Sequence, residues 1–220
     1  MSAGFEPRLD ALGKAQRRVW RELGATPRTF VLYGGTAIAL RLGHRQSDDF
    51  DFFSNRPFAP QELLDKVSYL KNAQVRQQAP NTLTCRIERG GRVLISYFGG
   101  LKLNRAADPE TARGGGVRVA SLLDLAATKL WAMAGRASLK DYVDMAALMR
   151  AGIELPDALA AARAVYGPRF NPFPSLKALT FFEEGDVQKL GDRDRHLLSN
   201  AAREVNANKL PTLRARRGLL

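Results

Sequence analysis

The chain has 220 residues, 45% of them hydrophobic and 25% charged, which is an ordinary balance for a globular protein of one large domain or two small ones. No apolar run approaches the ~18 residues that a membrane-spanning helix needs, and charges interrupt the apolar positions of residues 1–21, so we expect neither a membrane span nor a secretory leader. The single cysteine, Cys85, cannot form an internal disulfide, which favours a reducing, cytoplasmic location.

The net charge is +12, with an isoelectric point of about 10.3. The surplus is spread along the chain, and residues 193–220 hold seven Lys or Arg against two Asp or Glu. Such an excess suits a polyanion, of which nucleic acid is the obvious candidate. An arginine-rich genome is the alternative explanation, and the basic segments show no interleaved aromatic residues of the kind that stack on bases.

The first quarter of the chain predicts a helix, a strand, a short helix and a second strand, at residues 7–23, 29–33, 36–42 and 49–53. Gly34 and Gly35 separate the first strand from the short helix, and two glycines permit positive φ and a close backbone approach. Gly34, Gly35 and Thr36 therefore lie at a helix N-terminus, where free N–H groups and the helix dipole favour an anion such as phosphate.

The second strand carries two carboxylates. Because side chains alternate along a strand, Asp49 and Asp51 point to one face and Phe50 and Phe52 to the other. Two acids on one face repel each other unless a cation lies between them, and a hard divalent ion such as Mg²⁺ is the natural partner for oxygen ligands.

The middle of the chain predicts a helix and then mostly strands, at residues 61–72, 73–77, 81–88, 92–98 and 117–120. Gly90-Gly91 is typical of a hairpin. The polar, glycine-rich residues 105–116 predict a mobile loop.

From Ser121 onward the pattern is helical, with helices predicted at residues 122–134, 138–150, 156–166, 175–182 and 193–206, and a disordered basic tail at 214–220. Ser121-x-x-Asp124 and Ser138-x-x-Asp141 have the form of capping boxes. We therefore expect an α/β (α+β) protein with a mixed-sheet core at residues 1–118 and a helical C-terminal domain at 119–220.

Lys129 lies on the apolar stripe of its predicted helix, where an ammonium group costs desolvation unless it reaches an anion or water. On the next helix, Asp141 and Asp144 share a face with Met145 and Leu148. One interpretation directs Lys129 at a nucleotide phosphate. The others are an ion pair with the two acids or a side chain that extends to water.

Together these motifs resemble the active site of the nucleotidyltransferase superfamily, and more narrowly the AbiEii/AbiGii toxin family of bacterial toxin–antitoxin pairs. The resemblance rests on Gly34-Gly35-Thr36 followed by Arg45-x-Ser47-x-Asp49-Phe50-Asp51, and on Lys129 followed by Lys140-Asp141-x-x-Asp144. It implies a mixed-sheet nucleotidyltransferase core with a helical C-terminal half.

The resemblance also implies an activity and its residues. A nucleoside monophosphate would move from an NTP to an acceptor hydroxyl, with tRNA, at its 3′ end, as the acceptor. Asp49 and Asp51 would hold Mg²⁺, while Gly34, Gly35 and Thr36 would bind phosphates with help from Arg45 and Ser47. Lys129, Asp141 and Asp144 would complete the catalytic set, and a cognate antitoxin would be the protein partner.

Ser96 departs from this pattern, because many nucleotidyltransferases carry a third carboxylate on the strand that it occupies here. Two rival functions therefore stay open: a nucleotidyltransferase for small molecules such as antibiotics, and a catalytically degenerate binding module. A metal hydrolase fits poorly, because His44 and His196 are the only histidines and lack ligand spacing. The catalytic hypothesis requires that Asp49, Asp51 and Lys129 converge on one pocket.

Overall fold

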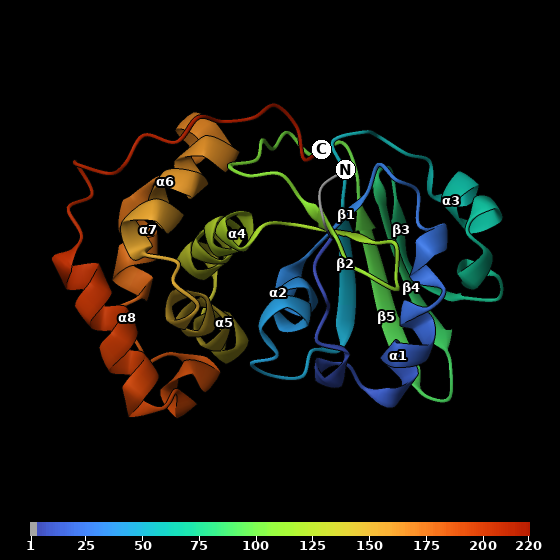
Figure 1. The fold of residues 1–220 in the computed structure, drawn as a ribbon, viewed down its shortest axis with the longest axis horizontal. Coiled ribbons are helices and arrows are strands. Elements are labelled where there is room, and N and C mark those ends of the chain that lie inside the picture. Colours follow the sequence, from blue (N-terminus) through green and yellow to red (C-terminus); the bar gives the residue numbers. More distant parts are fainter. Residues whose placement is uncertain (1–3) are drawn as a thin grey trace. The chain divides into compact units, whose positions relative to one another are not determined.

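The computed structural model describes residues 4–220, which form two compact units (Figure 1). The sheet unit runs from the described N-terminus to Leu103 and also takes in Asp108–Ser121 and Gly218–Leu220. The helical unit comprises Asn104–Ala107 and Leu122–Arg217. The backbone therefore passes from one unit to the other at several points. The sequence, by contrast, predicts a single boundary near residue 118.

The sheet has seven strands in the order β3-β4-β5-β2-β1-β7-β6. Their bounds are β1 Val31–Tyr33, β2 Asp49–Phe53, β3 Gln74–Ala79, β4 Thr82–Glu88, β5 Arg92–Phe98, β6 Glu110–Thr111 and β7 Arg118–Val119. The sheet is mixed, since β2 pairs parallel with β5 and β1 parallel with β7, while the remaining neighbours are antiparallel. The mixed-sheet α/β fold predicted from the sequence is confirmed.

The two faces of the sheet differ in burial. Phe50 and Phe52 on β2 are fully buried together with Ile95 and Tyr97, their partners on β5. Helices α1 (Lys14–Trp20) and α3 (Pro60–Lys66) lie on this side of the sheet, and α2 (Gly34–Leu42) lies on the other (Figure 1). Asp49 and Asp51 therefore project toward the side of α2, away from the aromatic core.

Burial also raises the pKa of the Cys85 thiol, on β4, to about 11. At neutral pH this cysteine is protonated and acts as a small apolar residue of the core.

The prediction of one continuous helix at residues 7–23 is wrong. The segment is divided into the 3₁₀ turn η1 (Leu9–Ala11), α1, and the 3₁₀ turn η2 (Leu23–Ala25). Leu12 and Gly13 are extended and separate η1 from α1, and Gln16 closes the first turn of α1 by accepting a hydrogen bond from the Gly13 N–H at 3.0 Å. The predicted helix at 61–72 is likewise shorter, because α3 ends at Lys66 and η3 (Ser68–Leu70) follows.

The helical unit contains α4 Leu122–Gly135, α5 Leu139–Arg150, α6 Leu155–Tyr166, α7 Pro172–Ala178 and α8 Asp192–Glu204, with 3₁₀ turns η4 Gly167–Arg169 and η5 Gly185–Lys189. Each corresponds to a predicted helix, and α7 begins three residues earlier than predicted because Asn171 caps it by accepting from the Phe173 N–H at 3.1 Å. Within the described residues 4–220, no helix is long and apolar enough to cross a membrane.

Two segments predicted to be mobile or disordered are ordered. Residues 105–116 contain β6, which pairs with β7. In the tail, Arg216 exchanges two backbone hydrogen bonds with Arg105, at 2.9 and 2.8 Å. The Leu219 N–H donates to Asn55 Oδ1 at 2.5 Å, and its side chain is 1% exposed. Backbone pairing of Arg216 and burial of Leu219 thus order a tail that its composition alone predicts to be disordered.

Candidate functional site

The diglycine turn between β1 and α2 leaves no room for side chains. Gly34 has φ +74°, and a Cβ atom built on it would lie 2.7 Å from Asp51 Oδ2. A Cβ atom on Gly35 would lie 2.4 Å from an Arg45 guanidinium nitrogen and 3.2 Å from Ser47 Oγ. The backbone of this turn is therefore packed directly against the Asp51 carboxylate, the Arg45 guanidinium and the Ser47 hydroxyl. Glycine permits this close approach because it has no side chain.

Thr36 joins the turn to the second strand. Its side chain is buried, and its hydroxyl is hydrogen-bonded to the Ser47 hydroxyl at 2.9 Å and to the main-chain carbonyl of Asp49. The first turn of α2, the loop that carries Ser47, and the start of β2 are thus fixed to one another.

The N-terminus of α2 faces the same cluster. Tyr33, the residue before the helix, makes no side-chain capping bond, so the N–H groups of the first turn have no side-chain acceptor at that position. Arg45 donates to the Gln46 carbonyl at 2.8 Å, which holds its guanidinium against Gly35. Uncapped amides, the helix dipole and an arginine together favour an anion.

The two acids occupy the same face of β2 in different settings. Asp49 opens the strand and is exposed, whereas Asp51 is half-buried between Tyr33 of β1 and Ser96 of β5. The pairing of β2 with β1 and with β5 positions both carboxylates.

This donor set fits Mg²⁺. Among residues 4–220 no group of three or more His, Cys, Asp and Glu is arranged to hold a metal ion. Magnesium is usually bound through one or two carboxylates, with substrate phosphates and waters as the other ligands, so two acids beside an anion-binding turn are sufficient.

The position beside Asp51 on β5 is occupied by a hydroxyl. Ser96 is the in-register neighbour of Asp51, is buried, and accepts a hydrogen bond from the Thr84 hydroxyl at 3.3 Å. The strand that the family resemblance marks for a third carboxylate is therefore where it was expected, and it carries a serine.

Substitution of Gly34 tests the packing of the turn. Gly34→Ala places a methyl group against Asp51 at positive φ, and we expect it to lower the free energy of unfolding by roughly 1–3 kcal/mol and to reduce nucleotide binding. Gly135→Ala is the control, because nothing lies within 4 Å of its Cβ position at the end of α4. Urea unfolding and nucleotide titration measure both variants, and equal stability of the two would contradict the strained turn.

The second predicted cluster lies within the helical unit. Lys129 Nζ of α4 is 2.7 Å from Asp141 Oδ1 and 2.6 Å from Asp144 Oδ2, both on α5. Arg136 Nε donates to the other oxygen of Asp141 at 2.9 Å. The lysine and both acids are buried, with side-chain exposures of 9%, 3% and 0%. The lysine on the apolar stripe is thus matched by two carboxylates of its own unit.

The acids of the two predicted capping boxes both make contacts beyond their own helix turn. Both oxygens of Asp124 accept from the main-chain N–H groups of Ala106 and Ala107, at 2.8 and 3.1 Å, which anchors that segment to α4. Ser138 makes no side-chain capping bond, and the Asp141 N–H donates instead to the Ser138 carbonyl at 2.9 Å. The Asp141 carboxylate is engaged by Lys129 and Arg136.

The predicted site residues thus gather in two clusters. Gly34, Gly35, Thr36, Arg45, Ser47, Asp49 and Asp51 lie together in the sheet unit, and Lys129, Asp141 and Asp144 lie together in the helical unit. Convergence of the two clusters stays a prediction.

The sequence profile of the nucleotidyl transferase AbiEii toxins of type IV toxin–antitoxin systems matches residues 19–114 and 104–212. The chain belongs to this family. The family is described as nucleotidyltransferase toxins, which supports nucleotidyl transfer as the general activity of this chain.

Other proteins are similar to this chain in sequence or in fold. An uncharacterised protein of Aquifex aeolicus is 32% identical over 159 residues, covering 70% of this chain and 74% of that protein. The fold is similar to MenT4, a nucleotidyltransferase toxin of Mycobacterium tuberculosis, with TM-score 0.61, 14% identity, and coverage of 88% and 84% of the two chains. A provisionally assigned nucleotidyltransferase of H. pylori gives TM-score 0.54, 17% identity, and coverage of 86% and 91%.

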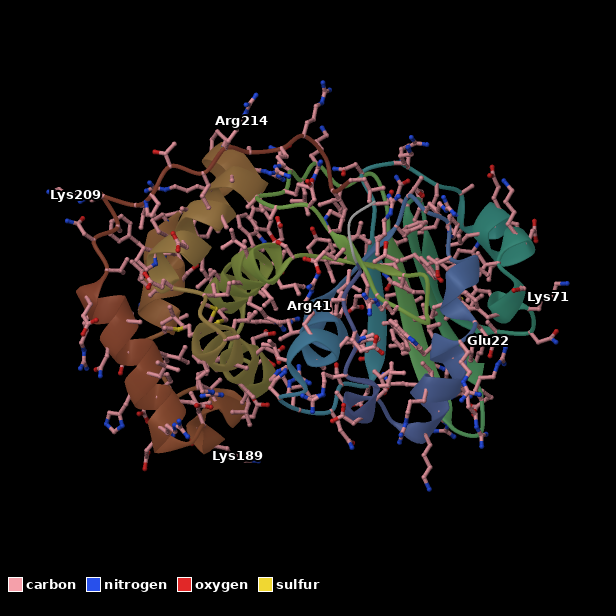
Figure 2. The ribbon with its side chains drawn as sticks, viewed as in Figure 1. Glu22, Arg41, Lys71, Lys189, Lys209 and Arg214 are labelled. Atoms are coloured by element: carbon pink, nitrogen blue, oxygen red, sulfur yellow. The ribbon has the colours of Figure 1, made fainter. Side chains whose placement is uncertain are left out.

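Arg41 is a half-buried residue of this AbiEii-family chain that the sequence analysis did not single out. It lies on α2, donates to the carbonyls of Ala120 and Val119 at 2.9 and 3.2 Å, pairs with Glu110 at 3.2 Å, and lies over the Phe5 ring (Figure 2). Burial lowers the pKa of the Arg41 guanidinium, an effect that Glu110 opposes. The sequence feature that could have indicated it is an arginine inside an otherwise apolar helix. Its contacts hold α2 against the end of β7.

Proposed function

We propose that the protein transfers a nucleoside monophosphate from an NTP to an acceptor hydroxyl, as the toxin of a toxin–antitoxin pair. The observation that carries the proposal is the contact of the Gly34-Gly35 backbone with Asp51, Arg45 and Ser47 at the uncapped start of α2. An anion-binding turn beside two carboxylates can bind a nucleotide and a divalent cation together, which is what phosphoryl transfer requires.

Within the sheet unit each residue has a distinct role. The N–H groups at the start of α2 bind the outer phosphates, and Arg45 adds a positive charge to the same oxygens. Thr36 and Ser47 hold the turn and β2 in register. Asp49 and Asp51 would hold Mg²⁺, which supplies charge neutralisation at the phosphates and leaving pyrophosphate.

In the helical unit, Lys129 is proposed as a cation for the phosphates, oriented by Asp141 and Asp144. The two short ion pairs support the orienting role of the acids. They also make the cluster important for stability, so its catalytic role requires a test that separates the two effects.

The proposed acceptor is the 3′ end of tRNA. Family resemblance and the net charge of +12 support an RNA acceptor. The toxin–antitoxin assignment supports a cognate antitoxin as partner, acting with the protein in the cytoplasm.

The proposal is tested by mass analysis of total tRNA after incubation with the protein, Mg²⁺ and each NTP in turn. We expect a mass increase of one or more nucleotide units with at least one NTP, and no increase when EDTA replaces Mg²⁺. An unchanged tRNA mass with all four NTPs would contradict tRNA as the acceptor. A parallel incubation with aminoglycosides tests the small-molecule alternative.

Ser96 favours a second candidate function, a degenerate module that binds nucleotide without turnover. A hydroxyl replaces the third carboxylate next to Asp51. Nucleotide binding without transfer to any acceptor, and growth arrest that survives Asp49→Ala, would support this alternative.

A further inference from the structure

Four arginines of the helical unit lie where its short segment Asn104–Ala107 pairs with the end of its long segment Leu122–Arg217. Arg105 forms an antiparallel bridge with Arg216, and the Arg105 side chain also donates to the Arg217 carbonyl at 2.9 Å. Arg214 lies two residues before the bridge, and Arg214 and Lys209 extend outward from this segment in Figure 2. We call Arg105, Arg214, Arg216 and Arg217 the arginine cluster.

The cluster is held in place by its backbone. Besides the Arg105–Arg216 pairing, the Ala106 and Ala107 N–H groups are bound by Asp124, and the Asn104 N–H donates to the Val165 carbonyl at 3.0 Å. On the far side of Arg217, Leu219 is buried against the sheet unit. A tail restrained on both sides loses less conformational entropy when its side chains bind a ligand.

The exposed part of this surface is rich in positive charge. Arg214, Arg216 and Arg217 are exposed, and they line a hollow of about 600 Å³ together with Ala106 and Ala215. Segments 104–107 and 207–217 contain no acidic residue, and no ion pair among the described residues 4–220 involves Arg214 or Arg217. A guanidinium binds phosphate through two parallel hydrogen bonds, so the cluster is suited to a chain of phosphates.

An exposed aromatic ring of the same unit is linked to the cluster through neighbouring residues. Trp131 stacks on Tyr166 with ring centroids 4.3 Å apart and is itself 40% exposed. Tyr166 directly follows Val165, whose carbonyl holds the segment that carries Arg105. Proteins that bind single-stranded RNA commonly combine arginines, which contact the phosphates, with exposed aromatic rings, on which the bases stack.

We propose that the arginine cluster and Trp131 form a binding surface for the phosphate backbone and an unpaired base of the RNA acceptor. This inference rests on the proposed RNA acceptor and adds the surface that recognises it. RNA is favoured over an acidic protein because the hollow is lined by arginines and alanines, without the large apolar side chains found at the centre of protein interfaces.

The test measures binding of a fluorescent hairpin RNA with a single-stranded 3′ end, without NTP, over a series of salt concentrations. We expect the triple variant Arg214→Ala/Arg216→Ala/Arg217→Ala to bind at least tenfold more weakly, and the slope of log affinity against log salt to fall by about 2 to 3. Trp131→Ala should weaken binding by roughly tenfold with little change in that slope. The backbone pairing of Arg216 survives the substitutions, and thermal unfolding verifies this.

The matched control is Lys189→Ala/Arg193→Ala/Arg203→Ala, which removes the same charge from exposed positions of the same unit. We expect less than a threefold effect from this control. Equal losses in both triple variants would overturn the proposal, since net charge alone would then explain binding. Unchanged RNA binding by the cluster variant, or loss of antitoxin binding alone, would also overturn it.

The result is independent of catalysis. Asp49→Ala should bind the RNA as the unmodified protein does while failing to transfer nucleotide. Failure of the unmodified protein to bind the RNA therefore overturns the surface. Failure of the unmodified protein to transfer nucleotide, although it binds the RNA, overturns the proposed function.

Discussion

Asp49→Ala is expected to reduce nucleotidyl transfer by roughly 1,000-fold or more while the protein stays folded. The carboxylate is one of two proposed Mg²⁺ ligands, and metal-based charge stabilisation is worth several kcal/mol, of which each 1.4 kcal/mol corresponds to a tenfold rate. Because Asp49 is exposed and shares a strand face with Asp51, its removal should change the free energy of unfolding by less than about 0.5 kcal/mol.

Single-turnover transfer of labelled NTP, together with urea unfolding, measures both quantities. Asp48→Ala is the matched control: it removes a neighbouring exposed acid that precedes β2 and is not among the proposed ligands. We expect that control to retain most of the activity. Full transfer by Asp49→Ala would remove the metal-binding role from β2.

Lys129→Ala is expected to have the largest effect on stability, lowering the free energy of unfolding by roughly 3–5 kcal/mol. The ammonium is the shared partner of Asp141 and Asp144, and its loss leaves two carboxylates buried in α5, only one of which retains Arg136. Lys189→Ala removes an exposed lysine of the same unit and should change stability by less than about 0.5 kcal/mol. Chemical unfolding of both variants provides the comparison.

A compensated variant separates structure from catalysis. Lys129→Met/Asp141→Asn/Asp144→Leu replaces the buried charges by groups of similar size, and buried ion pairs can be replaced in this way with little loss of stability. We expect the compensated variant to fold and to be inactive in transfer. A folded variant with normal transfer would show that Lys129 has only a structural role.

Local pattern was sufficient for most of the sheet unit. Alternation over five residues predicted β2 with its bounds, because a strand with one buried face imposes a period of two on its side chains. The same reasoning identified the diglycine turn and its helix. It failed for residues 7–23, where helical spacing continues through Gly13, because the pattern records which residues are buried and not whether one continuous helix buries them.

Lys129 shows what helical spacing can predict and what it cannot. Helical spacing indicated that its side chain is buried and needs an anion, and named Asp141 and Asp144 as one possible partner. Choosing among the alternatives required the packing of α4 on α5, which brings a lysine within 2.7 Å of acids that follow it by at least twelve residues.

The sequence by itself determined the family and most of the strands and helices, and it predicted the chemistry of the two motifs, since all of these depend on residues close together in the chain. Only the tertiary structure decided that Ser96 lies beside Asp51, that Arg41 fastens α2 to β7, and that the basic tail pairs with Arg105. These contacts join segments up to 112 residues apart, where no local period links one partner to the other and only burial and hydrogen bonding of the whole fold select the pair.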